Sequence, residues 1–243
     1  MIRFFSKIRY KLAAENRVAK YTRYAIGEIL LVVIGILIAL QINNWNENRK
    51  ELKAQNKLLI NLYENLSADS IFLVENRQSM LTIIETQRQI QAVREEQLKS
   101  TDINSPQSIR ASIRYSSITK ENHPDIATKV FNETLKEEIR TYYRLIASLE
   151  NSYSQYDNVV KQIIRPYLAK NLVFNPDFLF ENQNQLNNQN ILNLEQFHLI
   201  IERDDFGQIL FESNLKANET VAFFDELLTA NSKLRQSIQN EIK

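Results

Sequence analysis

An unbroken apolar run near the amino terminus constrains this chain more than any other feature. From Ile26 to Ile42 only Glu28 and Gln41 interrupt the run, and residues 29–40 contain no polar side chain. Helical residues rise about 1.5 Å each, so residues 24–45 rise about 33 Å, against a bilayer hydrocarbon core of about 30 Å. A helix over these residues is therefore long enough to cross a membrane.

This run has three interpretations: a membrane span, a cleaved signal, or the core helix of a soluble domain. A soluble core helix of this length is usually amphipathic, whereas the run is apolar on every side. A cleavable signal needs small residues at positions −3 and −1, and the sequence offers Ala39 and Gln41. Tyr21, Tyr24 and Trp45 stand where two membrane interfaces would fall. The favoured interpretation is an uncleaved, single-pass signal anchor.

The charges around the run predict its orientation. Seven basic side chains and one acid, Glu15, precede the run, and four basic side chains follow it in a comparable window. Since Lys and Arg are retained on the cytoplasmic side, we expect a basic cytoplasmic or interfacial segment (1–23), a transmembrane helix (24–45) and an exported helical bundle (46–243). The preceding basic residues are Arg3, Lys7, Arg9, Lys11, Arg17, Lys20 and Arg23, and those that follow are Arg49, Lys50, Lys53 and Lys57.

Two details inside the span have an ordinary and a functional interpretation. Gly27, Gly35 and Ala39 share one helix face, which is typical of close helix–helix approach in membranes but also of ordinary span composition. Glu28 is either a functional carboxylate or a side chain that reaches water near the positive end of the helix dipole. The ordinary interpretation is favoured for both, and the sequence does not decide.

A heptad pattern predicts a long helix over residues 46–99 that continues out of the span. Asp69 and Asn76 occupy seam positions, so the pattern indicates an imperfect coiled coil and is better explained as one wall of a helical bundle. The apolar seam residues are Leu52, Leu59, Leu66, Leu73 and Met80 at seven-residue intervals, with Leu62, Ile83 and Ile90 in the complementary position.

A second seam, in steps of four and three from Leu135 to Tyr167, predicts a central helix. Pro166 is expected to end or kink this helix at Arg165. The seam contains four tyrosines, which indicates wide packing with the phenol groups on polar partners. An aromatic ligand site is the alternative. The complete seam is Leu135, Ile139, Tyr142, Ile146, Leu149, Tyr153, Tyr156, Val160, Ile163 and Tyr167.

The remaining segments complete an all-α fold with an antiparallel helical bundle. The stretch around Pro106 predicts a short helix over 106–117 after a stop, and the asparagine-rich residues 171–196 predict a loop. A last helix is predicted over 205–241, interrupted near 213–217, with Asn218 as its N-cap.

Candidate chemistry in the chain is sparse. There is no cysteine, and the three glycines exclude glycine-rich nucleotide loops. His123, Pro124 and Asp125 match the short motif of J-domain co-chaperones, but the flanks lack the expected helix pair. The ordinary interpretation is a chain break at Pro124 with Asp125 as a helix cap.

Three acidic pairs and a second histidine are the remaining candidate site residues. Adjacent residues diverge on a helix, so the pairs Glu95/Glu96, Glu137/Glu138 and Asp204/Asp205 are expected to be solvated surface, and His198 an ordinary packed or surface residue. We therefore expect a non-enzymatic protein with no catalytic, cofactor or metal site and no nucleic-acid partner. The expected partners are the lipid bilayer and either a second copy of the chain or another membrane protein.

The stretch YAIGEILLVVIGILIALQINNWNENRK, residues 24–50, resembles a family of uncharacterised Bacteroidota proteins classified as a domain of unknown function. The resemblance is strongest in this block and continues more weakly as a helical pattern through the remainder. It implies a single-span protein of the inner membrane of a Gram-negative cell, with the bulk in the periplasm. It implies no catalytic residue and no known activity. The expected role is partner binding or self-association, and the alternative is a periplasmic ligand-sensing bundle that signals through a partner.

Overall fold

The computed structural model describes residues 18–181 and 191–242, and it divides the chain into two compact units, Met1–Lys57 and Leu58–Lys243. Each unit is described by itself. In the described ranges the regular elements are helices, with one isolated antiparallel bridge between Phe174 and Leu192. The all-α prediction is therefore confirmed. Most of the predicted basic segment 1–23 lies outside the described residues.

Helix α2 (Val18–Arg94) contains the apolar run and is long and apolar enough at its amino-terminal end to cross a membrane. The large apolar side chains from Ile26 to Ile42 are each 45–65% exposed, so no described part of the chain covers them. A Cβ added to Gly27 or Gly35 would meet no atom within 4 Å. The run is thus not the core helix of a soluble domain in this structure.

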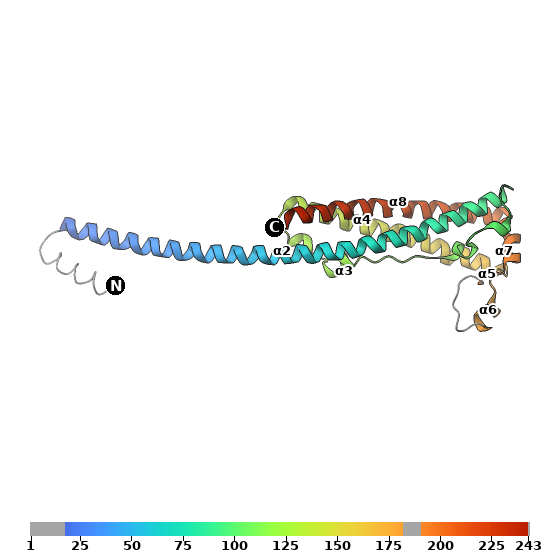
Figure 1. Cartoon of the computed structure of the whole chain (residues 1–243), viewed down its shortest axis with the longest axis horizontal. Helices are drawn as coiled ribbons and strands as arrows, with labels where there is room; N and C mark the ends of the chain where they lie inside the picture. Colours follow the sequence, from blue (N-terminus) through green and yellow to red (C-terminus); the bar gives the residue numbers. More distant parts are fainter. Residues whose placement is uncertain (1–17, 182–190, 243) are drawn as a thin grey trace. The chain divides into compact units, whose positions relative to one another are not determined.

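Three long helices build the second unit (Figure 1). Helix α8 (Asp204–Glu241) is antiparallel to α2, because Tyr63 and Arg77 of α2 are bonded to Gln239 and Asp225 of α8 respectively. It is also antiparallel to the central helix, because hydrogen bonds join Asn132 to Glu241 at one end of the pair and Gln155 to Lys216 at the other. α2 and the central helix are therefore parallel. The elements are α2 from Leu58, α4 (Glu133–Asn158) with η4 (Val159–Ile164) and α5 (Arg165–Lys170), and α8 (Asp204–Glu241).

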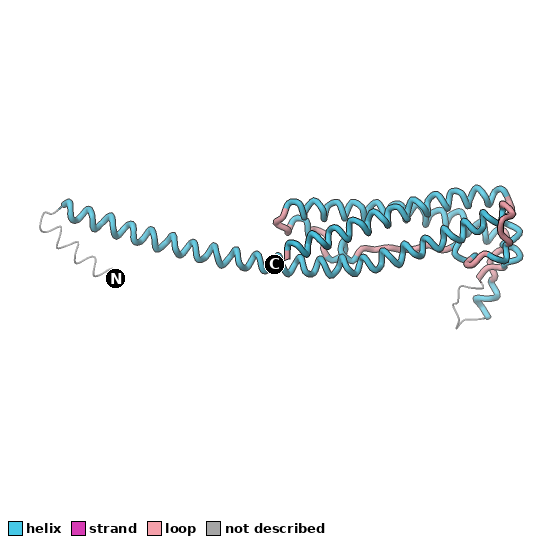
Figure 2. Tube along the Cα trace, turned by 45° about the horizontal axis from the view of Figure 1, so that its top comes forward, coloured by secondary structure: helices cyan, strands magenta, loops and turns pink. Residues whose placement is uncertain are grey.

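Because α2 and α4 are parallel, residues 95–132 must carry the chain back along the bundle. This connection lies across α2 and α4, and Figure 2 shows its extended part as a loop beside the helices. Asn104 is bonded to Gln89 of α2, and Ser112 to Tyr153 of α4. Its short helices are η1 (Ser100–Asp102), η2 (Pro106–Arg110), α3 (Ile118–Asn122) and η3 (Ile126–Thr128).

The predicted helix over 106–117 is wrong beyond Arg110. Residues 111–117 are extended, and Ile113 and Tyr115 of this stretch are buried in the core. The alternation of Ile113 and Tyr115 with exposed Arg114 and Ser116 is a strand-like period, which fits a single extended segment packed on helices.

Pro166 does not end the central helix. Residues Val159–Ile164 form a π-helical turn, in which the Arg165 N–H donates to the Val160 carbonyl, and the helix continues to Lys170. A proline has no N–H to donate and clashes with the preceding turn, and the wider π turn accommodates both defects. The helix ends with Leu172 at φ 58°.

The carboxyl-terminal part contains more helix than predicted. The asparagine-rich region includes α6 (Pro176–Glu181) and the start of α7 (Leu194–Ile201), while residues 182–190 lie outside the description. The predicted interruption of α8 near 213–217 is wrong, because Ser213 and Ala217 are buried on its inner face. Asn218 is an interior residue of α8 rather than an N-cap.

The predicted seams form most of the bundle core, but Ile163 of the second seam is 43% exposed, and its neighbour Ile164, in the π turn, is buried instead. Leu59, Leu66, Leu73 and Met80 are fully buried, whereas Leu52 is 58% exposed and belongs to the first unit. The structure therefore confirms α2 as one wall of a bundle from residue 59 onward. Tyr142, Tyr153, Tyr156 and Tyr167 each have a hydrogen-bond partner for the phenol group, as the packing interpretation predicts.

Candidate functional site

The residues singled out from the sequence are dispersed over the second unit. His123 accepts a hydrogen bond at Nε2 from Asn65 of α2, at 2.8 Å, and its carbonyl accepts from the Tyr143 hydroxyl. Burial of the ring lowers its pKa below the ordinary histidine value, with Lys129 acting in the same direction. Asp125 occupies the N-cap position of η3, as predicted, but its side chain forms an ion pair with Lys129 and makes no capping hydrogen bond.

The acidic pair on α4 diverges, as predicted, but Glu138 is not solvated surface, because its side chain is only 15% exposed. Glu137 is paired with Arg140 and Arg144, whereas its neighbour Glu138 is paired with Lys233 of α8. His198 is half-buried on α7. Within the described ranges, no three His, Asp or Glu side chains are placed to hold a metal ion.

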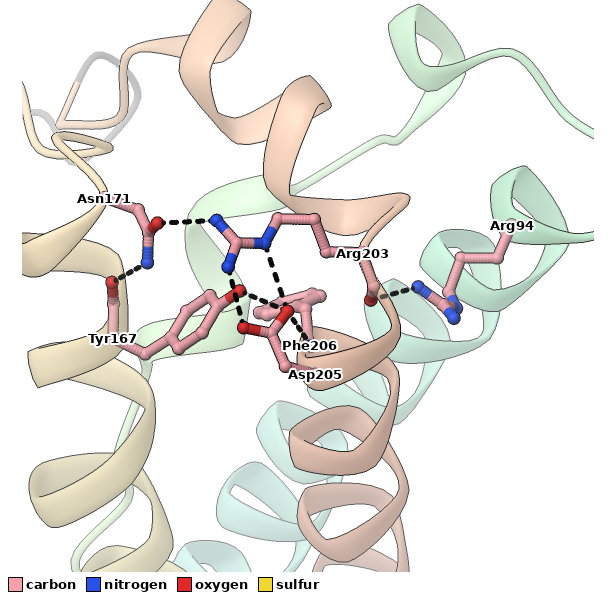
Figure 3. Close-up of polar contacts among 6 residues, drawn as sticks. All are labelled: Arg94, Tyr167, Asn171, Arg203, Asp205 and Phe206. Atoms are coloured by element: carbon pink, nitrogen blue, oxygen red, sulfur yellow. Dashed lines mark hydrogen bonds and ion pairs between the residues drawn. The ribbon is translucent and has the colours of Figure 1, made fainter.

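Asp205 lies at the corner where α7 meets α8 (Figure 3). Its neighbour Asp204 has a separate role, beside Arg94. The Arg94 guanidinium, at the end of α2, donates to the carbonyls of Ile201 and Arg203, both at 2.7 Å, and lies 3.6 Å from Asp204. The Ile201 carbonyl belongs to the last residue of α7, and the Arg203 carbonyl also accepts the first helical bond of α8, from the Gly207 N–H. Arg94 therefore closes the end of α7 and ties it to the start of α8.

A second set of bonds fixes the same corner to α5. Arg203 donates twice to Asp205 and once to Asn171, and the Tyr167 hydroxyl donates to Asp205 at 2.8 Å (Figure 3). Burial, and next the bond to Asp205, raise the pKa of Tyr167 to about 12. Arg203, and then Tyr167, hold the pKa of Asp205 below its ordinary value. The corner is thus a saturated set of polar contacts that orders the chain between α5 and α8.

A groove of about 900 Å³ lies between α2 and α8 beside this corner. Its α2 wall extends from Ile84 to Arg94, and its α8 wall from Asp204 to Asn218. Five of its lining side chains are carboxamides, and Phe211 adds a phenyl ring that is 67% exposed. The carboxamides are Gln87, Gln91, Gln208, Asn214 and Asn218.

Three of these carboxamides are joined in one hydrogen-bonded chain. Asn218 donates to Asn214 Oδ1 at 3.0 Å, Asn214 donates to Gln87 Oε1 at 3.0 Å, and Gln87 donates to Ser213 at 2.8 Å. Because Gln87 and Ser213 are buried, the inner end of this chain is fixed in the core. The groove therefore presents oriented amide groups on two rigid helices.

The groove was not predicted from the sequence. Its residues are scattered singly on two helices that lie far apart in the chain, and carboxamides on a helix surface are ordinary. The only available signal was the glutamine-rich end of the first bundle helix, with Gln87, Gln89 and Gln91 in close succession. Pairing that end with α8 required the structure.

A buried carboxylate lies at the middle of the bundle. Asp69 is fully buried, and it accepts hydrogen bonds from the Ser117 hydroxyl, the Ile118 N–H and the Tyr142 hydroxyl at 2.7, 2.7 and 3.2 Å, with a longer contact to the Thr119 N–H. Burial raises the pKa of Tyr142 above its ordinary value. These contacts join α2, α3 and α4, so the seam aspartate has a structural partner set.

Comparison with known proteins gives one match. No curated protein and no solved structure matches the chain. A family model described as a family of unknown function, DUF6090, matches residues 28–197. The match begins inside the apolar run and extends through α2, the connection, α4 and α5 into α7. The chain therefore belongs to this family of unknown function, DUF6090.

Proposed function

We propose that the chain is a membrane-anchored helical protein that acts, without catalysis, by binding a partner protein or a second copy of itself. The observation that carries the anchor is the exposure of the apolar run, of which no residue is buried by the described chain. Leu, Ile and Val at the centre of a span each favour insertion by about 0.3–0.6 kcal/mol. The run contains twelve of them, so insertion gains several kcal/mol.

The orientation is part of this proposal. Seven basic side chains before the run and four after it favour an amino terminus in the cytoplasm. The second unit would then lie in the periplasm of a Gram-negative cell, attached to the inner membrane by a single span.

Exposed apolar side chains on the bundle support the association part of the proposal. Ile71 and Val74 of α2 are 61% and 54% exposed, and they lie on neighbouring turns of the helix. Apolar side chains that cluster at a surface mark contact sites more often than single ones do.

The second candidate is a ligand-binding bundle that passes a signal to another protein. The groove between α2 and α8 is the observation that favours it.

Crosslinking in intact cells tests the association. The chain has no cysteine, so Val74→Cys introduces a single thiol on the exposed face of α2, and Glu133→Cys provides a matched surface control on α4. After treatment with a short bismaleimide, the expected result is a crosslinked species from Val74→Cys and monomer from Glu133→Cys. Monomer from both variants and from Ile71→Cys would contradict self-association through this face of α2.

A further inference from the structure

The groove between α2 and α8 has a lining that selects among classes of ligand. We propose that it binds a neutral, hydroxyl-rich ligand, an oligosaccharide, along the α2 wall from Ile84 to Arg94. This wall is about 15 Å long at 1.5 Å per residue, which suits a short linear chain of sugars. The inference rests on the second candidate function, the ligand-binding bundle, and it depends on neither the span nor a protein partner.

The carboxamides carry the first part of the argument. Each amide group offers both donors and an acceptor, which complements hydroxyl groups that also donate and accept. Asn218 uses its donors on Asn214, and its Oδ1 forms no bond within the described ranges. The Gln208 amide likewise forms no hydrogen bond to any described residue, and it is exposed at the groove.

Phe211 carries the second part. Its ring is 67% exposed although α8 has buried positions one residue away, and it lies in the groove lining beside Gln208 and Asn214. The C–H face of a pyranose ring is apolar and packs on an aromatic ring, while its hydroxyl edge needs polar partners. A phenyl ring flanked by amides provides both surfaces.

The charged side chains of the groove lining do not favour a charged ligand, because they already have partners in the same unit. Arg94 is bonded to two carbonyls and lies near Asp204, and Arg88 is paired with Glu85. The guanidinium charges are therefore balanced by carboxylates of the same unit.

The groove fits peptide ligands less well. A partner helix has its main-chain groups bonded internally, so its apolar face would bury the carboxamides without hydrogen bonds, which costs free energy. An extended peptide is usually held by a sheet edge, whereas the groove walls are both helical.

The test uses the full chain in lipid nanodiscs, free of glycosidic detergents. Binding of chitotetraose and maltotetraose is measured by saturation-transfer NMR and calorimetry, with tetraalanine and sodium phosphate as probes of the other ligand classes. We expect at least one tetrasaccharide to bind. Phe211→Ala should weaken that binding about tenfold, since an aromatic contact adds on the order of one decade of affinity. Asn218→Ala and Gln208→Ala should each weaken it severalfold.

Matched variants separate a local effect from loss of fold. Leu199→Ala on α7 removes an apolar side chain that is 64% exposed, and Asn240→Ala removes an exposed amide near the end of α8, so neither should change binding. Circular dichroism checks that each variant is folded. The proposal is overturned if neither tetrasaccharide binds, if tetraalanine or phosphate binds in their place, or if folded Phe211→Ala and Asn218→Ala bind like the parent chain. None of these outcomes bears on crosslinking at Val74.

Discussion

At the scale of single residues, the position of the Arg94 side chain requires a glycine at position 207. A Cβ added at Gly207 would lie 2.6 Å from the Arg94 guanidinium, so the absence of a side chain makes room for the cation that closes α7. In a helix, alanine is otherwise preferred over glycine by about 0.5–1 kcal/mol.

A double-mutant cycle tests this pair. Gly207→Ala should destabilise the parent chain by about 1–2 kcal/mol, because the displaced guanidinium loses charge-assisted bonds. In an Arg94→Ala background the same change should stabilise by about 1 kcal/mol, through helix propensity alone. Urea unfolding of the four proteins measures the difference. The same change in the free energy of unfolding in both backgrounds would show that the close approach of Gly207 and Arg94 has no energetic consequence.

Leu172 is a residue in an unfavourable conformation. Its φ of 58° is rare for leucine, and its side chain is 74% exposed, so little packing is lost on truncation. Leu172→Gly should stabilise the fold by about 0.5–1 kcal/mol, since glycine adopts this conformation freely at helix ends. Leu199→Gly, which places glycine inside α7, should destabilise, and thermal unfolding compares the two. A lower melting temperature for Leu172→Gly than for the parent would refute the argument.

His123 predicts a pH dependence of stability. Its folded pKa is lower than that of the unfolded chain, so the unfolded chain binds more protons. The stabilisation is complete above the unfolded pKa of about 6.5, and it is lost as pH falls through the folded value. The free energy of unfolding should therefore drop between pH 7.5 and pH 5 more in the parent than in His123→Gln. Equal decreases in the free energy of unfolding of the two proteins would mean that protonation of the His123 ring does not weaken its contact with Asn65.

At the scale of the elements, the apolar seams of the helices were predictable, whereas the places where helices end, bend or continue were not. The steps of three and four that bury Tyr142 and Tyr156 depend only on helical periodicity, which the sequence records directly. The π turn before Pro166 could not be foreseen, because propensity rules predict a break and the alternative depends on tertiary packing. The expected interruption of α8 failed for the same reason: Ser213 and Ala217 are small because they face a neighbouring helix.

Asp69 tests how the connection is held on the bundle. Asp69→Ala leaves the Ser117 and Tyr142 hydroxyls and the Ile118 N–H without their acceptor. Each buried unpaired group costs about 1–3 kcal/mol, so the free energy of unfolding should fall by about 3 kcal/mol or more. Asp69→Asn keeps one acceptor oxygen and should cost less. Asn76, the other polar seam residue, is bonded to its own helix at the Phe72 carbonyl, so Asn76→Ala should cost under about 1 kcal/mol. Chemical denaturation ranks the three variants, and equal costs for Asp69→Ala and Asn76→Ala would contradict the role of the carboxylate network.

At the scale of the whole molecule, the sequence predicted the all-α class and the helical run, but not the groove. The run is visible because the twelve consecutive residues 29–40 contain no polar side chain. The groove depends on bringing Gln87 and Asn214 together from helices that are distant in sequence, and on the parallel course of α2 and α4, which the long connection 95–132 allows. No local sequence pattern indicates the pairing of Gln87 with Asn214 or the parallel course of α2 and α4.

Membrane flotation tests the central claim, that the apolar run lies in lipid. Membranes from cells that make the full chain are washed with alkaline carbonate and centrifuged upward through a sucrose gradient, which separates lipid-bound protein from aggregates. The chain should float, whereas Ile34→Arg combined with Leu37→Arg, at a cost of about 2.5–3.5 kcal/mol per central arginine, should leave the floating fraction. A parent chain that stays with the soluble or aggregated protein while an established membrane protein floats would contradict the claim.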